Sequence, residues 1–232
     1  MKKVDIGIIG ALAEEVEMLI ARLDSHTTER LGSIDFHLGI LEGKRVAIAR
    51  CGIGKVFAAI CAEAMIIGYS PELIVNTGVG GALAKDLNVT DTVIADRLVQ
   101  HDMDTSPIGD PKGLISGINK IWFDTDPRAR EKLLSAAERL GLRARVGAIA
   151  SGDRFVATSD VKEGIVSEFG ADVCEMEGAA IAHTAFVNDT KVVVIRAISD
   201  SANEGSSMDY MTFMPIAAKN SAALTLELVR EY

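Results

Sequence analysis

A wholly apolar run that ends in charged residues does most to constrain the fold of this chain. Residues 192–195 read Val-Val-Val-Ile, and the strand they predict continues through Arg196 to Asp200. The preceding strand is short and ends in Glu175-Met-Glu177, and an alanine-rich helix begins there and separates the two strands. Ligands of open α/β sheets bind beyond the carboxyl ends of the strands. We therefore expect Glu177, Arg196 and Asp200 to converge on one crevice.

A purely structural interpretation of the same residues stays open. A buried Glu–Arg pair between neighbouring strands is often only a structural bridge, and an aspartate at a strand end can cap the following turn. Asp200, however, follows Ser199 at the point where the apolar run stops. Catalytic side chains are commonly held at such strand ends, and this favours a functional interpretation.

Composition narrows the class of protein. The 232 residues are 48% hydrophobic, which predicts one domain spanning residues 1–232 with a sizeable core. The net charge of −9 argues against a nucleic-acid or anionic-membrane partner and favours a small molecule. Cys51, Cys61 and Cys174 have no metal-site or disulfide spacing and are expected in the core of a cytoplasmic protein. No apolar stretch has membrane-spanning length, and no signal peptide is expected.

Strands alternate with helices along the chain. The expected strands cover residues 4–9, 34–40, 45–50, 73–75, 92–96, 145–150 and 191–200. The expected helices cover residues 14–23, 56–67, 127–140 and 209–229, with one more after residue 177. This order predicts an α/β fold with a single, mostly parallel sheet covered by helices.

Two further motifs are candidates for the crevice. Glu15 lies in the first turn of the first helix, where the helix dipole alone explains an acidic residue, but it could also face Asp200. The glycines of Gly78-Val-Gly-Gly81 predict a sharp bend where a planar ligand can lie against the backbone. The sequence Gly52-Ile-Gly-Lys55 lacks the remaining residues of a phosphate-binding loop.

Residues 101–125 form a long segment rich in Gly, Pro and Asp. A loop of this length is usually functional, and we expect a lid or a subunit contact. His101-Asp-Met-Asp104 offers possible metal ligands, but a solvated loop explains it better. Its apolar residues have no period that would bury them internally, which predicts a dimer interface; they are Met103, Ile108, Leu114, Ile115 and Trp122.

Several motifs together resemble the 5′-methylthioadenosine/S-adenosylhomocysteine nucleosidases of the purine nucleoside phosphorylase superfamily. They are Gly7-Ile-Ile-Gly-Ala-Leu-Ala-Glu-Glu15, Gly52-Ile-Gly-Lys55, Asn76-Thr-Gly78, Ser151-Gly-Asp153, Glu175-Met-Glu177 and Arg196-Ala-Ile-Ser-Asp200. The resemblance implies a three-layer αβα fold, a homodimer, and no metal or organic cofactor. It also implies hydrolysis of the bond between adenine and a 5′-thio-substituted ribose, as in methionine salvage and methyl-cycle detoxification. 5′-Deoxyadenosine is a further candidate substrate.

The resemblance implies a role for each matching residue. Glu15 activates water, Asp200 protonates adenine N7, and Arg196 supports the water and the carboxylates. The expected ribose and base contacts are Glu177 for the hydroxyls, Met176 and Tyr210 for the sugar, Phe155 for stacking, and the backbone of Val156 for the adenine edge. The remaining expected site residues are Ser199 beside Asp200, Ile53 on the 5′ side, and Val79, Gly80 and Glu175 in the binding wall.

Two departures from the family pattern concern specificity. Val79 stands where the best-known members have a serine near the acid. The resemblance also implies a lid over the 5′ pocket, formed by Thr105, Ile108 and Asp110 of the partner subunit. Ile108 and Asp110 replace aromatic residues there. The preferred 5′ substituent is therefore open.

Two rival functions remain. A phosphorylase of the same superfamily would bind phosphate through arginines, whereas this chain has Asn76 and the carboxylate of Glu15 at the corresponding places. A non-catalytic nucleoside sensor would need no acid–base pair. The combination of Glu15, Glu177, Arg196 and Asp200 favours the hydrolase.

Overall fold

The computed structural model describes residues 3–232 as one mixed sheet with helices on both faces. The strands are β1 (Ile6–Gly10), β2 (Asp24–Leu31), β3 (Ile34–Leu41), β4 (Lys44–Arg50), β5 (Leu73–Ala82), β6 (Thr92–Gln100), β7 (Trp122–Asp124), β8 (Ala144–Ser151), β9 (Val173–Glu175) and β10 (Lys191–Asp200). The helices are α1 (Ala13–Ile20), α2 (Lys55–Tyr69), the 3₁₀ turn η1 (Ser106–Ile108), α3 (Pro127–Leu140), α4 (Ser159–Phe169), α5 (Gly178–Val187) and α6 (Ser206–Glu231).

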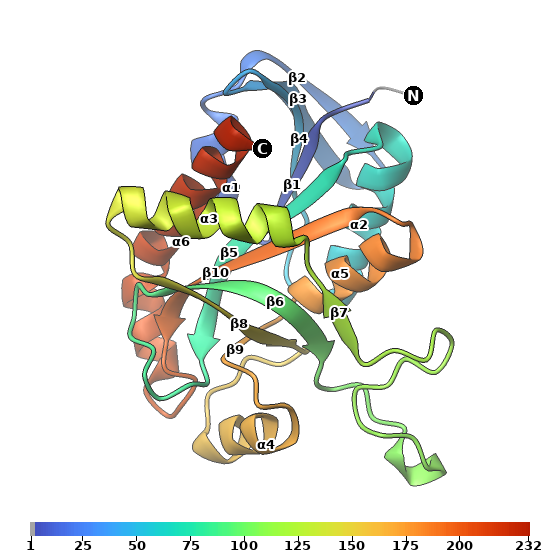
Figure 1. Ribbon diagram of the computed structural model, residues 1–232, viewed down its shortest axis with the longest axis vertical. Helices are drawn as coiled ribbons and strands as arrows, with labels where there is room; N and C mark the ends of the chain where they lie inside the picture. The colour runs from blue at the N-terminus through green and yellow to red at the C-terminus, as the bar shows by residue number, and fades with distance from the viewer. Residues whose placement is uncertain (1–2) are drawn as a thin grey trace.

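The layers of the fold follow from which side of the sheet each helix covers. Helices α1, α3 and α6 pack together on one face, and α2 and α5 pack together on the other, as Figure 1 shows. Helix α4 lies below the sheet in that view, and the segment that carries η1 extends away from the body. The predicted α/β sheet with helices on both sides is confirmed.

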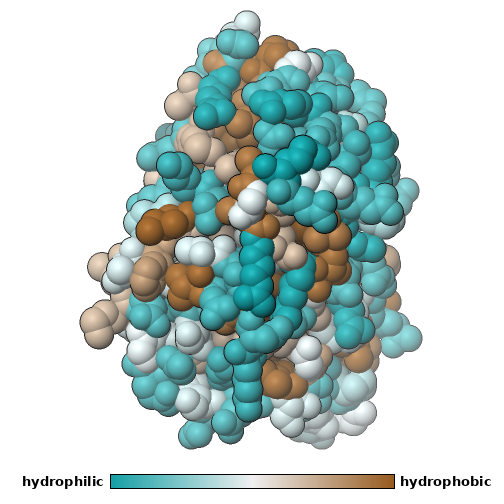
Figure 2. Space-filling view, turned by 60° about the vertical axis from the view of Figure 1, so that its left-hand side comes forward, coloured by the Kyte–Doolittle hydropathy of each residue, from teal (hydrophilic) through white to brown (hydrophobic). Residues whose placement is uncertain are grey.

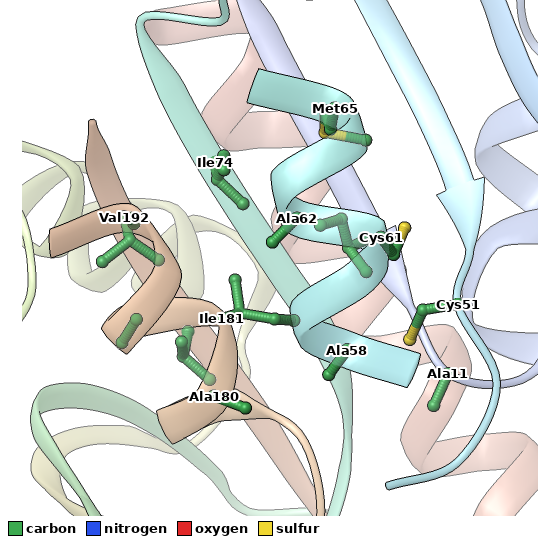
Figure 3. Packing of buried hydrophobic residues seen from close by; sticks show 14 of the residues in the cluster. Ala11, Cys51, Ala58, Cys61, Ala62, Met65, Ile74, Ala180, Ile181 and Val192 are labelled. Atoms are coloured by element: carbon green, nitrogen blue, oxygen red, sulfur yellow. The ribbon is translucent and has the colours of Figure 1, made fainter. Parts of the chain in front are cut away.

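Strands β5 and β10 form the centre of the core because they are buried on both faces. In β5, Leu73 and Val75 face the α1, α3 and α6 side, while Ile74 faces α2 and α5. Figure 3 shows Ile74 and Val192 beneath α2 and α5, with Ala62 and Ile181 among the residues packed over them. Unbroken apolar runs are typical of strands covered on both sides.

The topology brings several strand ends to one edge. Strand β1 is parallel to both β4 and β5, and β5 is parallel to β10. Near its end β5 also pairs with β9, in antiparallel fashion. The residues that follow β1, β5 and β10 therefore meet at one edge of the sheet, as the sequence predicts for their charged residues.

Several elements and boundaries differ from the sequence prediction. Strands β2 and β7, the turn η1 and helix α4 were not predicted, and β6 continues to Gln100, beyond the predicted residue 96. Helix α1 ends at Ile20, before the predicted residue 23. The glycine run of β5 does not bend sharply: the strand continues to Ala82, with β10 paired beside it as far as Gly81. The predicted turn there is wrong, because the glycines serve close packing within the sheet.

Surface and core agree with a globular chain. Cys51, Cys61 and Cys174 are buried and free, and burial raises the pKa of both Cys61 and Cys174 to about 12. Figure 2 shows the face that carries α3 and α6, which is mostly hydrophilic with separate apolar patches. Within residues 3–232, none of the helices has the length and apolar character needed to cross a membrane.

Candidate active site

A cavity of about 360 Å³ opens at the edge where β1, β5, β9 and β10 end. Most of the predicted site residues line it: Ile53, Val79, Gly80, Phe155, Val156, Glu175, Met176, Glu177, Ser199, Asp200 and Tyr210. Predicted strand-end residues that are far apart in the sequence thus line the same cavity.

Glu15 lies directly behind the cavity wall. The loop after β1 turns back into α1. One carboxylate oxygen of Glu15 therefore accepts hydrogen bonds from the backbone N–H groups of Ala11 at 2.7 Å and Leu12 at 2.9 Å. The other oxygen accepts from Val79 N at 3.1 Å, and all three donor residues line the cavity. Burial raises the pKa of Glu15, against the opposing effects of Arg196 and these donors. Glu15 therefore belongs to this site and is more than a helix-end charge.

The glycines of β5 make room for the two carboxyl groups. A Cβ atom on Gly78 would lie 2.6 Å from Glu15 Oε1, and one on Gly81 would lie 2.9 Å from Asp200 Oδ1. Both distances are shorter than atoms tolerate, so any side chain at these positions would displace a carboxylate. The glycine run is required by close approach of the side chains around it.

A β-bulge at the end of β10 sets the direction of Asp200. The register with β5 shifts between Ile198 and Asp200, and the extra residue is Ser199. Asp200 accepts hydrogen bonds from Ala202 N and Ser199 Oγ, each at 2.9 Å. Burial raises the pKa of Asp200 in spite of these donors. The carboxyl group is thus held in place and biased toward its protonated form.

One guanidinium serves several buried carboxylates. Arg196 contacts Glu175 directly, lies 4.0 Å from Glu177, and donates to Asn76 Oδ1 at 2.6 Å. Ser151 and the backbone N–H of Gly178 also donate to Glu175. These bonds make Glu175 mainly the group that holds Arg196, although it reaches the cavity wall.

Glu177 is the carboxylate in this group that faces the cavity with the fewest partners. Its Oε1 accepts from Gly54 N at 2.8 Å, the N–H of the loop that precedes α2. Burial first, and then the charge of Glu175, raises the pKa of Glu177 to about 7, while Arg196 opposes the shift. The group carries more negative than positive charge, a setting that favours a ligand with donors or developing positive charge.

Aromatic and apolar side chains form the rest of the wall. Phe155 is 43% exposed, and its ring meets that of Tyr210 edge to face at 5.6 Å. Val156 is buried, and Ile53 is 54% exposed at the mouth of the cavity. The predicted stacking aromatic is therefore open on one side and held by α6 on the other.

The lid residues do not reach the cavity within this chain. Thr105 Oγ1 donates to Asp110 Oδ2 at 2.9 Å, and Ile108 is 81% exposed. None of the three lines the cavity. Of the five apolar residues of the segment, only Ile108 is exposed, because Ile115 and Trp122 pack against buried residues of this chain. The predicted lack of internal packing is wrong for these two.

Sequence reasoning missed part of the wall. Leu12, Arg154 and Cys174 also line the cavity. Arg154 and Cys174 directly adjoin the predicted Phe155 and Glu175 in the sequence, and this adjacency is the signal that could have found them. Leu12 could be placed only with the fold, since it contributes through the loop after β1.

The acidic residues of the 101–104 segment have protein partners. Asp102 pairs with Lys55 at 2.5 Å, and Asp104 accepts from Ser106 N at 2.9 Å. In the part of the chain that the structure describes, no group of three or more His, Cys, Asp or Glu is arranged to hold a metal ion.

Comparison with known proteins places the chain in a family. Residues 5–230 match the Phosphorylase superfamily. The chain is 36% identical to a 5′-methylthioadenosine/S-adenosylhomocysteine nucleosidase of Actinobacillus succinogenes, over 97% of this chain and 98% of that one. The crystal structure of the Neisseria meningitidis nucleosidase in complex with methylthio-immucillin-A is 35% identical, with a TM-score of 0.95 over 98% of this chain and 99% of that one.

A further structure shows how far the likeness extends. Futalosine hydrolase of Helicobacter pylori is 34% identical, with a TM-score of 0.94 over 98% of each chain. Identities of this size over nearly whole chains, with the same fold, establish common descent. The chain belongs to the phosphorylase superfamily, within the group of the 5′-methylthioadenosine/S-adenosylhomocysteine nucleosidases.

Proposed function

We propose that this chain hydrolyses the N-glycosidic bond of 5′-methylthioadenosine and S-adenosylhomocysteine, releasing adenine and a 5′-thio-substituted ribose. One observation carries the proposal. Asp200 lines the cavity, Glu15 is bound to three residues of its wall, and burial raises the pKa of both carboxyl groups. Such a pair can supply a general acid on one side of the glycosidic bond and a general base on the other.

In this mechanism Asp200 protonates adenine N7 and Glu15 activates water. As the bond to adenine breaks, positive charge develops on the sugar, and the buried carboxylates of Glu15 and Glu177 stabilise it. A raised pKa makes the carboxylate of Glu15 a stronger base and favours the protonated form of Asp200. Arg196 holds Glu175 and neutralises part of the charge in the resting site.

The cavity wall supplies the binding contacts. We assign stacking on adenine to Phe155, its edge to the backbone of Val156, and the ribose hydroxyls to Glu177. Met176 and Tyr210 cover the sugar, and Ile53 contacts the 5′ substituent at the cavity mouth. The exposed face of the Phe155 ring supports its assignment to stacking, and the contact of Tyr210 with that ring supports the assignment of Tyr210.

The phosphorylase alternative requires phosphate to bind beside Glu15, where Arg196 is the neighbouring cation. Arg196 is occupied by Glu175 and Asn76, and Glu15 would repel a dianion at the position where water is required. A phosphorylase needs an arginine clamp at that position. A sensor would gain nothing from two buried carboxyl groups that it must desolvate.

The decisive experiment compares phosphate-free buffer with high phosphate. Adenine release from methylthioadenosine should be the same in both, with free methylthioribose as the second product. If release requires phosphate, or if a ribose 1-phosphate forms, the chain is a phosphorylase. Futalosine, the substrate named for the Helicobacter relative, belongs in the same assay as a rival substrate.

We also propose a cytoplasmic homodimer built on the face of α2 and α5. A groove of about 1020 Å³ runs along this face, lined by Val56, Ile60, Ile67, Ala180 and Val187 among others. Val56, Ile60, Ile67 and Val187 are each more than half exposed, an apolar surface unusual for a monomer. Lys55 at its border pairs with Asp102, so the groove is continuous with the lid segment. A second copy would then bring its Thr105, Ile108 and Asp110 to the 5′ pocket.

Two further parts of the proposal concern the domain organisation and the location of the protein in the cell. Residues 1–232 act as one nucleosidase domain, supported by a sheet whose strands come from both halves of the chain. The cytoplasmic assignment is supported by three buried cysteines that are all free.

A further inference from the structure

A second groove adjoins the site cavity beyond Ile53. It has a volume of about 640 Å³ and shares Ala11, Leu12 and Ile53 with the cavity. The groove and the cavity therefore adjoin at Ile53, the residue that we propose for the 5′ side of the site.

The fold explains which residues form the groove. Strand β4 runs parallel to β1, and its last residue, Arg50, is paired with Gly10 at the end of β1. Helix α1 begins at Ala13, three residues after Gly10, which places Glu14 in its first turn. The same strand edge that forms the catalytic cavity thus also presents Arg50 and Glu14.

The groove combines an apolar floor with two opposite charges. Ile34 and Cys51 are buried beneath it, and Phe57 forms part of its wall. Arg50 and Glu14 both line the groove and are exposed. Within residues 3–232 neither side chain has an ion-pair partner, whereas Arg45 on the same strand is paired with Asp5. Two unpaired charges of opposite sign at an apolar cleft suit a ligand that carries both.

We propose that this groove binds a zwitterionic amino-acid group at the end of a 5′-thioether, with Arg50 on the carboxylate and Glu14 on the ammonium. This inference rests on the proposed nucleoside hydrolysis and adds the residues that select the 5′ substituent. The planar guanidinium of Arg50 matches a carboxylate through two parallel hydrogen bonds. The methylthio group of methylthioadenosine carries no charge and offers neither side chain an ion-pair partner. Arg50 and Glu14 thus discriminate between the two substrates.

The test measures kcat/KM for three substrates in parallel. They are methylthioadenosine, S-adenosylhomocysteine and 5′-S-(3-aminopropyl)-5′-thioadenosine, which keeps the ammonium but lacks the carboxylate. Arg50→Ala should lower kcat/KM for S-adenosylhomocysteine about tenfold, a modest effect because the side chain is exposed, and leave the other two unchanged. Arg50→Lys should restore part of the loss. Glu14→Gln should affect both substrates that carry the ammonium and spare methylthioadenosine.

Two control variants separate the groove from general charge effects. Lys44→Ala removes one positive charge from the other end of β4 and should change none of the three values. Arg154→Ala tests the arginine that lines the catalytic cavity itself. A selective loss for S-adenosylhomocysteine in Arg154→Ala, with none in Arg50→Ala, would overturn the assignment.

The outcomes also separate this inference from the proposed function. If neither methylthioadenosine nor S-adenosylhomocysteine is cleaved, the proposed function fails. If the wild-type chain cleaves methylthioadenosine, yet Arg50→Ala and Arg50→Glu change both substrates equally or not at all, only the groove assignment fails. Methylthioadenosine turnover also reports that each variant has folded.

Discussion

Glu15 and Asp200 have similar burial but different charged neighbours, and this difference supports the roles proposed for them. Three backbone N–H groups and the charge of Arg196 stabilise the ionised form of Glu15. Asp200 also has three donors, Ser199, Ala202 and Ser206, but it lies near Asp209, whose charge raises its pKa further. Glu15 is therefore the better base and Asp200 the better acid.

Removing either titrating group should abolish most of the activity. We expect Glu15→Gln and Asp200→Asn each to lower turnover of methylthioadenosine at least ~100-fold, because neither amide can exchange the required proton. Circular dichroism should show an unchanged fold. Glu17→Gln, an exposed change on the same helix, serves as the control. Near-normal turnover in either variant would refute the role of that residue.

Glu177 should make stability depend on pH. Its folded pKa of about 7 lies above the ordinary value of 4.5, so between these pH values the folded state binds a proton that the unfolded state has lost. The stability of the folded chain therefore falls as pH rises from about 4.5 to about 7. Glu177→Gln removes this loss and should be more stable than wild type at pH 8 by up to ~3 kcal/mol, and similar to it at pH 4.5.

Urea unfolding of both proteins at the two pH values measures this difference. Glu168→Gln, an exposed change on α4, provides the comparison. A difference between Glu177→Gln and wild type that stays constant with pH would show that Glu177 is not the titrating group.

The sequence predicted residues at strand ends better than residues that depend on loops. Glu177, Arg196 and Asp200 follow short apolar runs, and parallel strands bring such positions together. For Glu15 the helix dipole was an equal explanation, and only the bonds to Leu12 and Val79 decide against it. The lid stays a prediction, because Thr105, Ile108 and Asp110 do not line the cavity of their own chain.

The glycines of strand β5 leave the space that neighbouring side chains occupy. A Cβ atom on Gly78 would collide with Glu15, whereas a Cβ on Gly164 of α4 meets no atom within 4 Å. Gly78→Ala should lower turnover at least ~10-fold, since displacement of a reacting group by about 1 Å can cost two orders of magnitude. Gly164→Ala should keep full activity and gain up to ~1 kcal/mol of stability.

Turnover and thermal unfolding of both glycine variants test this prediction. Wild-type turnover in Gly78→Ala would mean that Glu15 can move without loss, and the tight fit would then have no catalytic meaning. The comparison is matched, because both variants add one methyl group.

Two of the elements that the sequence did not predict, β2 and α4, lack an apolar pattern. Strand β2 is exposed along nearly its whole length and pairs with β3 at the edge of the sheet. In α4 only Ile165 is fully buried. The glycine run of β5 gave a genuine turn signal, which pairing with β10 and β9 overrides. Tertiary contacts, which local sequence does not contain, decide these three cases.

At the scale of the whole molecule, the apolar face of α2 and α5 should hold two copies together. Light scattering at micromolar concentration should give twice the chain mass. Ile60→Asp places a charge in the middle of the proposed contact and should give a monomer with weaker binding of methylthioadenosine. Leu140→Asp, on the end of α3, should leave the mass unchanged. A monomeric wild-type chain would contradict the proposed dimer.

The placement of Arg196 near the end of the chain sets an order for folding. During synthesis, the segments carrying Glu15, Glu175 and Glu177 leave the ribosome before β10. Until β10 inserts beside β5, these carboxylates lack the cation that compensates them, and burying them without it is strongly unfavourable. The catalytic pocket therefore cannot close before β10 inserts, and a nascent chain that stops short of Arg196 remains open at its centre.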